Sequence, residues 1–300
     1  MQEVKVQQTT FIALVAQKAE DFKLLVKFRL SLTVVFSSLM GFLIAARLGV
    51  QSWSALGMLA LGGFLVTAAA NTLNQVLEKD YDRLMQRTAN RPLAAGRMRN
   101  QDAVLLAGIM SLLGVSILAM FNPWTAFLGM VALLMYAFVY TPMKRVGPIA
   151  VMIGAVPGAL PTLIGAAAAE GSISALGLSL FAIQFFWQFP HFWSIAWLGH
   201  DDYTRAGYRL LPGKDGERNE ETGFQAFLYA IPLLPLVLLP YFTGISGWIS
   251  AVLLVLLSAV YTWLGWNLYR KNDRKAALQL MFFSFFYIPV ALIAIWADKI

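Results

Sequence analysis

The sequence predicts an all-α integral membrane protein, and three observations support this prediction. Hydrophobic residues make up 59% of the 300-residue chain and charged residues only 13%, about half the charged share of a soluble domain. Apolar stretches long enough to cross roughly 30 Å of hydrocarbon recur along the chain. The remaining charges gather between these stretches. Because backbone groups in lipid must bond within their own segment, we expect a bundle of transmembrane helices.

Nine stretches are predicted to span the membrane. They cover residues 29–46, 55–76, 103–121, 124–140, 148–169, 174–197, 225–243, 247–266 and 278–297. Of the 23 Lys and Arg residues, 21 lie at the N-terminus up to Arg29 or in the loops after the second, fourth, sixth and eighth stretches, and the other two are Arg47 and Lys299. By the positive-inside rule, this places the N-terminus in the cytoplasm and the C-terminus outside.

The chain is predicted to consist of an N-terminal segment and one membrane domain. Within residues 1–28, apolar residues recur at helical spacing between polar ones, as in an amphipathic helix that lies in the membrane interface. Residues 29–300 are predicted to form a single nine-helix domain. Its two large loops, 77–102 and 198–223, are both expected on the cytoplasmic side, where any chemistry in water would take place.

Two features of the composition exclude classes of function. The chain contains no cysteine, which excludes disulfides, thiolate metal sites, a thiol nucleophile and covalent haem attachment at a CxxCH motif. The net charge of +7 does not point to nucleic acid, because the basic residues flank the membrane stretches. The lipid bilayer is the expected partner of these charges.

A polar helix face begins inside the second stretch and continues into the following loop. Thr67, Asn71, Asn74, Glu78 and Asp82 are spaced four, three, four and four residues apart, which places them on one side of a helix. Oxygen ligands one turn apart suit Mg²⁺, which keeps waters and binds few carboxylates together with substrate phosphates. A solvated helix end with internal charge pairs is the alternative, but asparagines at membrane depth favour a binding site.

Basic residues follow this face in the sequence. Arg87 and Arg91 lie in the same loop, and guanidinium groups suit phosphate oxygens. Lys144 and Arg145 follow the fourth stretch, where Pro142 is expected to end the helix and hold the pair at the interface. Anchoring to anionic lipid headgroups is their alternative role, and some of them are expected to serve both roles.

The sixth stretch carries Gln184, Gln188 and His191 on one helix face, surrounded by aromatic residues such as Trp187. Such a face is expected to line a cavity rather than to face lipid. The aromatic rings could pack on a flat ligand or shield a cation, and they could equally belong to the core or to the interface belt. A lone buried histidine is more often a structural hydrogen-bonding residue than a metal ligand.

Five blocks of the sequence resemble one family. Asn74-x3-Glu78-x3-Asp82 resembles the NxxxDxxxD motif of the UbiA superfamily of intramembrane prenyltransferases, with Glu in place of the first Asp. Five stretches in family order resemble its haem O synthase branch, namely DYDRLMQRTANRPL (80–93), YTPMKR (140–145), GAVPGALPTLIG (154–165), WQFPHF (187–192) and DDYTRAGYRLLP (201–212). These blocks follow one another in order over roughly residues 70–215.

The resemblance implies an enzyme that transfers a farnesyl group from farnesyl diphosphate to a vinyl group of haem b, with hydroxyl addition, to give haem O and diphosphate. It implies Mg²⁺ as the cofactor, bound by Asn74, Glu78, Asp82 and Asp202. The diphosphate would be held by Arg87, Arg91, Lys144 and Arg145. Contacts with haem, or with the cavity around it, are expected from Tyr140, Gln184, Trp187, Gln188 and His191.

The second large loop departs from the pattern of the superfamily. It opens with Asp201 and Asp202, where many members carry a DxxxD motif. Leu198 and Ala206 lie four residues before and after Asp202, so the strict motif is absent. Asp202 is expected to bind a second metal ion, and Asp201 either joins it there or pairs with Arg205 four residues later.

The resemblance also implies a cellular setting. It places the protein in the inner membrane of a bacterium, with the active site on the cytoplasmic side and the product used in haem-copper oxidase assembly. Haem A synthase and oxidase-assembly proteins are the protein partners it suggests. A sister prenyltransferase that acts on an aromatic acid or quinone precursor is one alternative, and the blocks WQFPHF and DDYTRAG argue against it. A transporter is another, but the carboxylates lie at the cytoplasmic edge rather than at midplane.

Overall fold

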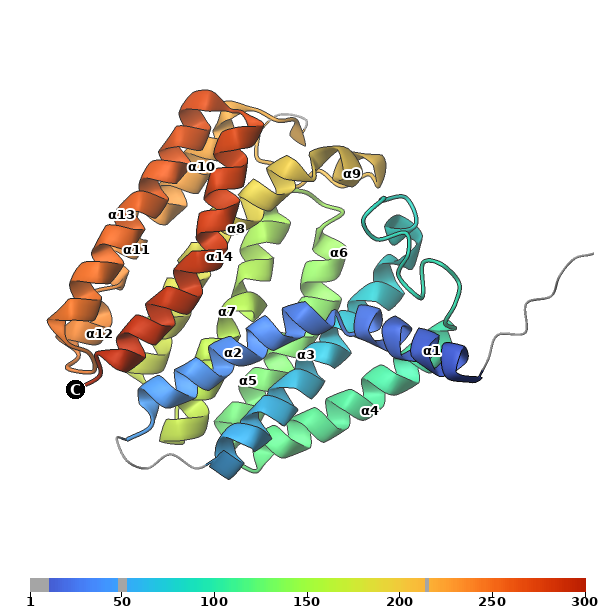
Figure 1. Ribbon diagram of the computed structural model, residues 1–300, viewed down its shortest axis with the longest axis horizontal. Coiled ribbons are helices and arrows are strands. Elements are labelled where there is room, and N and C mark those ends of the chain that lie inside the picture. Colours follow the sequence, from blue (N-terminus) through green and yellow to red (C-terminus); the bar gives the residue numbers. More distant parts are fainter. Residues whose placement is uncertain (1–10, 48–52, 214–215) are drawn as a thin grey trace, which may run out of the picture.

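The computed structural model describes residues 11–47, 53–213 and 216–300, and Figure 1 shows a bundle of long helices. Within these ranges the chain forms helices and a single isolated β-bridge, between Ser246 and Lys299. The predicted all-α class is therefore confirmed. Residues 1–10 of the predicted N-terminal segment lie outside the described ranges, and α1 (Phe11–Leu25) occupies most of the remainder.

Eight segments in the described ranges are long and apolar enough to cross a membrane. They are α2 (Phe28–Ala45), α3 (Trp53–Asp82), α4 (Asn100–Ala119), the run Pro123–Met143, α7 (Ile149–Glu170), the run Glu220–Phe242, α13 (Trp248–Lys271) and α14 (Arg274–Ala297). Each coincides with one of the nine predicted stretches. The remaining stretch forms α8 (Ala175–Leu198), which has 24 residues but interrupts its apolar sequence with two glutamines and a histidine.

Prolines break two of these runs. The run Pro123–Met143 consists of α5 (Pro123–Leu134), the π-helical turn η1 (Met135–Tyr140) and α6 (Thr141–Met143). Pro142 has no N–H to donate to a preceding turn, and the backbone N–H of Thr141 reaches back to Tyr136 O in the longer π-type bond. The run Glu220–Phe242 is divided into α10 (Glu220–Ala230), α11 (Leu233–Leu236) and α12 (Leu239–Phe242).

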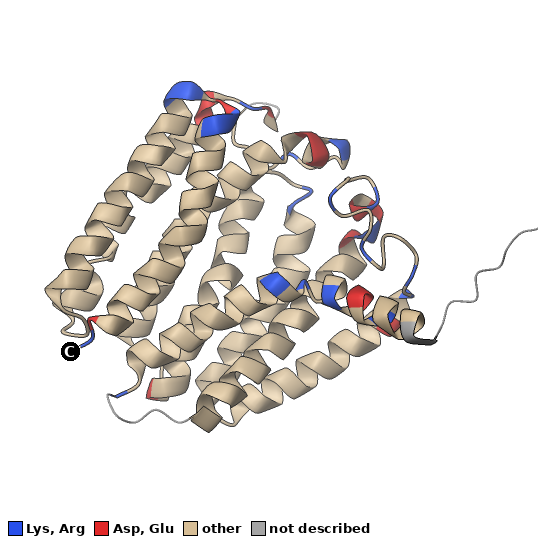
Figure 2. Ribbon diagram, in the orientation of Figure 1, with Lys and Arg blue, Asp and Glu red and all other residues tan. Residues whose placement is uncertain are grey.

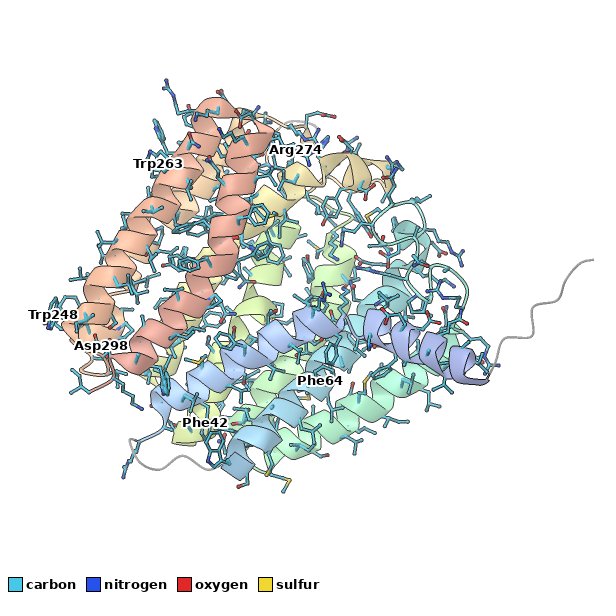
Figure 3. All side chains as sticks on the ribbon, viewed as in Figure 1. Phe42, Phe64, Trp248, Trp263, Arg274 and Asp298 are labelled. Atoms are coloured by element: carbon cyan, nitrogen blue, oxygen red, sulfur yellow. The ribbon has the colours of Figure 1, made fainter. Side chains whose placement is uncertain are left out.

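The charged residues gather at one end of the bundle (Figure 2). This end holds α1, the loop after α3, the short helix α9 (His200–Arg205) and the link between α13 and α14. Figure 3 shows Arg274 at this end, whereas Asp298 lies at the opposite end beside Trp248. The two large loops therefore lie together, as the charge pattern predicted.

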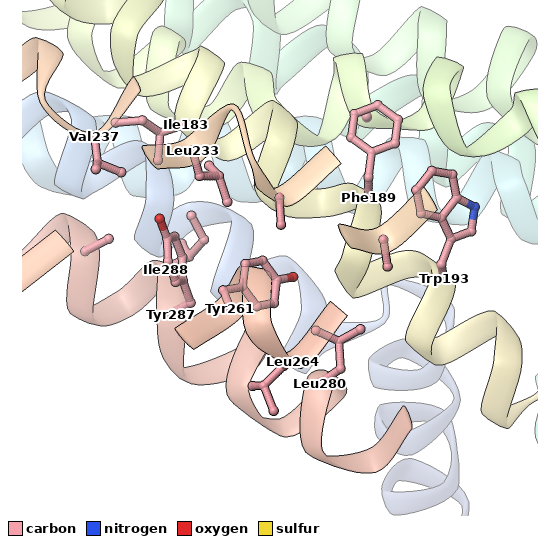
Figure 4. Close-up of a cluster of buried hydrophobic side chains, with 14 of the residues drawn as sticks. Ile183, Phe189, Trp193, Leu233, Val237, Tyr261, Leu264, Leu280, Tyr287 and Ile288 are labelled. Atoms are coloured by element: carbon pink, nitrogen blue, oxygen red, sulfur yellow. The ribbon is translucent and has the colours of Figure 1, made fainter. Parts of the chain in front are cut away.

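Two apolar cores support this end. The larger one joins α8, α10, α13 and α14, and Figure 4 shows Phe189, Trp193, Tyr261 and Tyr287 within it. The second joins α2, α3, α4 and α7. Helices α2 and α7 cross closely, because a methyl group on Gly41 would overlap the backbone of α7 and one on Gly165 would overlap α2. Between them, the cores fix the helices whose charged ends carry the site.

Candidate active site

The predicted polar face lies on the last turns of α3. The helix continues to Asp82, six residues beyond the predicted end of its stretch. Asn74, Glu78 and Asp82 therefore share one continuous helix face, and their residues are only 0%, 3% and 1% exposed. Buried polar groups of this kind need partners, and the structure supplies a different cation to each of them.

The three cations come from three different elements. Lys27, at the start of α2, donates from Nζ to Asn74 Oδ1 at 2.7 Å. Lys144, just after α6, lies 2.9 Å from Glu78 Oε1. Arg91, in the loop after α3, donates from Nη1 to both carboxylate oxygens of Asp82, at 2.7 and 2.9 Å. The site thus joins the start of α2, the end of α3 and the two segments that follow α3 and α6.

Lys27 is the site residue that the sequence did not reveal. It links α1 to α2 with a left-handed backbone, at φ 47° and ψ 55°, a conformation that costs a non-glycine residue about 1–2 kcal/mol. The backbone turn directs its side chain inward, where it also donates to Tyr136 OH at 3.3 Å. In the sequence, a lysine directly before an apolar stretch looks like an interfacial anchor, so no signal separates it from the other basic residues.

Local structure explains why Lys144 and Arg91 reach α3. Thr141 directly follows the π-helical turn, and its Oγ1 accepts a hydrogen bond from Asn74 Nδ2 at 2.9 Å. This contact holds the end of α6, and hence Lys144, against α3. In the loop after α3, the buried Thr88 hydroxyl donates to Asp82 O at 2.9 Å. The loop therefore folds back over the end of its own helix, which brings Arg91 to the Asp82 carboxylate.

These residues surround a cavity of about 150 Å³. It is lined by Lys27, Leu30, Glu78, Asp82, Met85, Arg87, Arg91, Tyr140, Lys144, Tyr203, Tyr208 and Leu210. We call it the α3 cavity. Its wall combines two carboxylates with four cations, and Tyr208 OH donates to Glu78 Oε1 at 3.4 Å. An excess of positive charge beside buried oxygens suits a polyanion that arrives with a metal ion.

The electrostatics of the α3 cavity shift the pKa values of the groups beside it. Burial lowers the pKa of Lys144, but the neighbouring Glu78 carboxylate outweighs this effect and leaves that pKa raised. Burial, together with Arg91 and Lys144, lowers the pKa of Lys27 well below its ordinary value. Burial and the Glu78 carboxylate raise the pKa of the Tyr208 hydroxyl, so it stays protonated and able to donate.

A second cavity of about 470 Å³ adjoins the first. Its lining comprises Gln86, Arg87, Ile195, Leu198, Gly199, Asp201, Asp202, Tyr203, Arg205 and Met281. We call it the α9 cavity. It shares Arg87 and Tyr203 with the α3 cavity, and Arg87 Nη2 donates to Tyr203 OH at 3.4 Å. This pair forms the boundary between the two spaces.

The two aspartates of the second loop have different surroundings. Asp202 accepts hydrogen bonds from the backbone N–H groups of Gln86 and Arg87, both at 3.3 Å, and from Arg205 Nη1 at 2.9 Å. Asp201 has a 73% exposed side chain and pairs with Arg218 at 3.0 Å, which lowers its pKa. The predicted alternative, a pair of Asp201 with Arg205, is wrong: Arg205 pairs with Asp202 instead, and Arg218 occupies Asp201. Both aspartates line the α9 cavity rather than the α3 cavity.

Of the predicted diphosphate ligands, Arg87, Arg91 and Lys144 line the α3 cavity and Arg145 does not. Arg145 Nη2 donates to Leu77 O at 3.0 Å. Its guanidinium lies 4.4 Å from the centre of the Tyr81 ring. Arg145 thus packs against the last turns of α3, outside the α3 cavity.

The predicted acceptor residues of α8 face two neighbouring helices. Gln184 Nε2 donates to Gly158 O at 3.0 Å, and Gln188 Nε2 donates to Ala155 O at 2.9 Å, so both glutamines pack on α7. His191 instead contacts α14 (Arg274–Ala297). Pro190 lies between Gln188 and His191 and interrupts the hydrogen-bond ladder. The single polar face predicted for α8 is therefore shared between two interfaces.

The oxygen atoms beside the α3 cavity fit a hard divalent cation: Glu78 and Asp82 line the cavity, and Asn74 lies one helical turn before Glu78 on α3. Asn74, Glu78 and Asp82 offer oxygen atoms, which Mg²⁺ prefers. Within the described ranges, no three His, Asp or Glu side chains converge closely enough to enclose a metal ion by themselves. Such a set suits Mg²⁺, which usually completes its shell with waters and substrate phosphates.

Comparisons with known proteins agree with this geometry. The UbiA prenyltransferase family model matches residues 34–287. A protoheme IX farnesyltransferase of Cytophaga hutchinsonii is 44% identical over 95% of this chain and 99% of its own length. A digeranylgeranylglyceryl phosphate synthase structure covers 94% of this chain and 98% of its own, with a TM-score of 0.79 and 16% identity. A UbiA homologue of Archaeoglobus fulgidus bound to DMAPP and Mg²⁺ covers 92% of this chain and 99% of its own, with a TM-score of 0.70 and 15% identity.

Proposed function

The chain belongs to the UbiA prenyltransferase family, and we propose that it transfers a farnesyl group from farnesyl diphosphate to a vinyl group of haem b, with addition of a hydroxyl group from water, giving haem O and diphosphate. The observation that carries the donor half is the polar end of α3, where the buried side chains of Asn74, Glu78 and Asp82 each meet a cation. Glu78 and Asp82 line the α3 cavity. The acceptor half is supported by the protoheme IX farnesyltransferase that matches nearly the whole chain.

The residues of the α3 cavity have complementary roles in this proposal. Asn74, Glu78 and Asp82 would hold Mg²⁺, and the ion would neutralise charge on the departing diphosphate. Arg91 and Lys144 line the same cavity and already carry their charges at its wall, so a diphosphate entering beside the carboxylates meets both. Donors that are in place before charge develops stabilise it without reorganisation.

Lys27 and Arg87 complete the set of cations around the diphosphate. Lys27 enters from α2 and Arg87 from the boundary with the α9 cavity. Asp202 lines the α9 cavity and accepts a hydrogen bond from the backbone N–H of Arg87. We assign Asp202 to a second metal position. Asp201 is assigned to holding Arg218, because that contact already occupies it.

The wall of the α3 cavity also suits a carbocation. As the bond between C1 of the farnesyl group and the diphosphate oxygen breaks, positive charge develops on the allylic carbons. Tyr140, Tyr203 and Tyr208 line the cavity, and aromatic faces attract such a charge. The terminal vinyl carbon attacks C1 of the farnesyl group, and the positive charge left on the neighbouring vinyl carbon is quenched by water, which becomes the hydroxyl group with release of a proton.

The proposed location is the inner membrane of a bacterium. We assign α8 as the ninth span, because its 24 residues are long enough and its glutamines bond to α7 rather than meeting lipid. Nine spans, with the charged end cytoplasmic by the positive-inside rule, leave the C-terminus outside. On this assignment α1 lies in the cytoplasmic interface, where Asp21 pairs with Arg97 of the loop after α3 at 2.8 Å.

A competition between acceptors tests the proposal. The purified protein is given labelled farnesyl diphosphate, Mg²⁺ and equal amounts of haem b and 4-hydroxybenzoate. We expect the label in the haem fraction only. Label in the benzoate alone would show that the acceptor is an aromatic acid and not haem. Uptake of farnesyl diphosphate into vesicles without any covalent product would favour a transporter.

A further inference from the structure

An ion pair holds the loop after α3 to α1. Arg97 lies in this loop, and its Nε and Nη2 atoms both lie 2.8 Å from Asp21 Oδ1 of α1. The Asp21 side chain is only 5% exposed, and that of Arg97 is 26% exposed. A buried carboxylate depends strongly on its partner. Figure 1 shows the loop meeting α1 near the charged end of the bundle, so this pair joins two segments that are far apart in the sequence.

The same guanidinium also bonds back to its own loop. Arg97 Nη1 donates to Asn90 Oδ1 at 2.9 Å, and Nη2 donates to Asn90 O at 2.8 Å. All three nitrogen atoms of the guanidinium are therefore bonded, and its planar group joins α1 to the middle of the loop. We call Asp21, Asn90 and Arg97 the α1 clasp.

The α1 clasp ends beside a cation of the α3 cavity. Asn90 directly precedes Arg91, whose Nη1 donates to both carboxylate oxygens of Asp82. The Asn90 carbonyl group that Arg97 holds belongs to the peptide unit that leads into Arg91. The chain between them turns tightly, since the backbone N–H of Arg97 donates to Pro92 O at 2.8 Å. The clasp therefore fixes the backbone from which the Arg91 side chain extends.

α1 is a fixed support for this contact. Leu25 of α1 is fully buried and packs with Leu93 of the loop and Ala103 of α4. Gln75 Nε2 of α3 donates to the last two carbonyl groups of α1, at 2.8 and 2.7 Å. These contacts hold α1 one helical turn after Asp21, so the Asp21 carboxylate has a defined position when it meets Arg97.

From these contacts we propose that Arg97 is a positioning residue for Arg91 and that α1 supports it through Asp21. The proposal rests on the proposed function, in which Arg91 binds the diphosphate of the donor. When the diphosphate replaces Asp82 as the partner of Arg91, the loop backbone still holds Arg91 beside the α3 cavity. A loop that had to be ordered during binding would lose affinity.

The test measures the affinity of the full-length protein for inorganic pyrophosphate in the presence of Mg²⁺, by calorimetry in detergent. Arg97→Gln removes the charge from the clasp. Arg97→Lys keeps a charge for the buried Asp21 but lacks the planar fork that joins it to Asn90. We expect both variants to bind pyrophosphate more weakly than wild type. For Arg97→Gln the loss should be about 10-fold or more, as for lost hydrogen bonds to a charged group.

The same measurement in an Arg91→Gln background separates positioning from general weakening of the fold. If Arg97 acts through Arg91, adding Arg97→Gln causes no further loss of affinity once Arg91 has lost its charge. An equal loss in both backgrounds would overturn the positioning role. Wild-type affinity in Arg97→Gln or in Arg97→Lys would overturn it as well.

Arg99→Gln is the matched control. Arg99 follows Arg97 by two residues and makes two hydrogen bonds to Asp102, at 2.9 and 2.8 Å, but its side chain is 78% exposed and its partner lies on α4. We expect its pyrophosphate affinity to stay within about two-fold of wild type. A loss equal to that of Arg97→Gln would overturn the inference, because any nearby positive charge would then suffice. A wild-type protein that binds no pyrophosphate with Mg²⁺ would instead overturn the proposed function.

Discussion

Replacing Asp82 with Asn removes one charge from the centre of the proposed metal face while keeping the size of the side chain. The Asp82 carboxylate is almost fully buried and accepts two hydrogen bonds from Arg91 Nη1. Two unit charges about 4 Å apart interact by about 4 kcal/mol at an effective dielectric constant of about 20. If that attraction acts on the metal-bound transition state, its loss slows transfer by about 10³-fold.

The assay measures the initial rate of haem alkylation at saturating farnesyl diphosphate and haem b, over a range of Mg²⁺ concentrations. Asp80→Asn is the matched control, because Asp80 lies two residues earlier, has a 70% exposed side chain and contacts Arg83 at 3.4 Å. We expect the control to stay within about two-fold of wild type, as surface pairs contribute little. An Asp82→Asn protein that kept more than about a tenth of the wild-type rate would refute the metal role.

Asp82→Asn should also lower stability, which has to be measured separately from the rate. The Arg91 side chain is only 16% exposed, and a mostly buried cation that loses its partner costs roughly 3 kcal/mol. Thermal unfolding in detergent should therefore begin at a lower temperature. The rate comparison is made well below that temperature, where both proteins elute as folded species.

The remaining predictions concern residues around the same site. Lys144→Gln should lower the steady-state transfer rate by about 10²-fold or more, because Lys144 lines the α3 cavity. Arg145→Gln should lower the same rate by less than about ten-fold, because Arg145 lies outside that cavity. Lys27→Met should raise the KM for farnesyl diphosphate and lower the melting temperature, because it leaves the buried Asn74 Oδ1 without its partner. A wild-type KM would exclude Lys27 from binding. Gly158→Ala should cost about 1–3 kcal/mol in thermal unfolding, since its methyl would overlap Gln188 Oε1. Gly108→Ala is the matched control: a methyl group at Gly108 would meet open space, so this variant should leave the thermal stability unchanged or raise it.

The fold class and the acidic half of the site could be predicted from the sequence. Apolar length, loop charge and helical spacing are local properties, and they placed Asn74, Glu78 and Asp82 on one helix face before any contact was known. The prediction from the spacing is correct for these three residues because α3 continues through all of them. A helix that ended at residue 76 would have separated Asn74 from the two carboxylates.

The cationic half could be predicted only in part. Arg91 and Lys144 belonged to the motifs, but their pairing with Asp82 and Glu78 depends on a folded loop and on the π-helical turn at Met135–Tyr140. Lys27 depends on a left-handed backbone at a helix junction, which leaves no periodic pattern in the sequence. Side-chain partners across helices are set by packing, and one sequence does not encode them locally.

The polar face of α8 shows the limit of angular arguments. Gln188 and His191 differ by three residues, and an ideal helix would point both to nearly one side. In the structure Gln188 fits over Gly158 of α7, while His191 pairs with Ser284 of α14. The spacing identified the polar residues correctly, but the neighbouring helices decided which partner each one meets.

The most direct test of the central claim is the mass spectrum of haem extracted after the purified protein has been incubated with haem b, farnesyl diphosphate and Mg²⁺. We predict a new haem species heavier by one farnesyl group and one hydroxyl. It should appear with wild type and with Asp80→Asn, and be lost without Mg²⁺ or in Asp82→Asn. Unmodified haem b in every sample, with active protein shown by farnesyl transfer to another acceptor, would contradict the account.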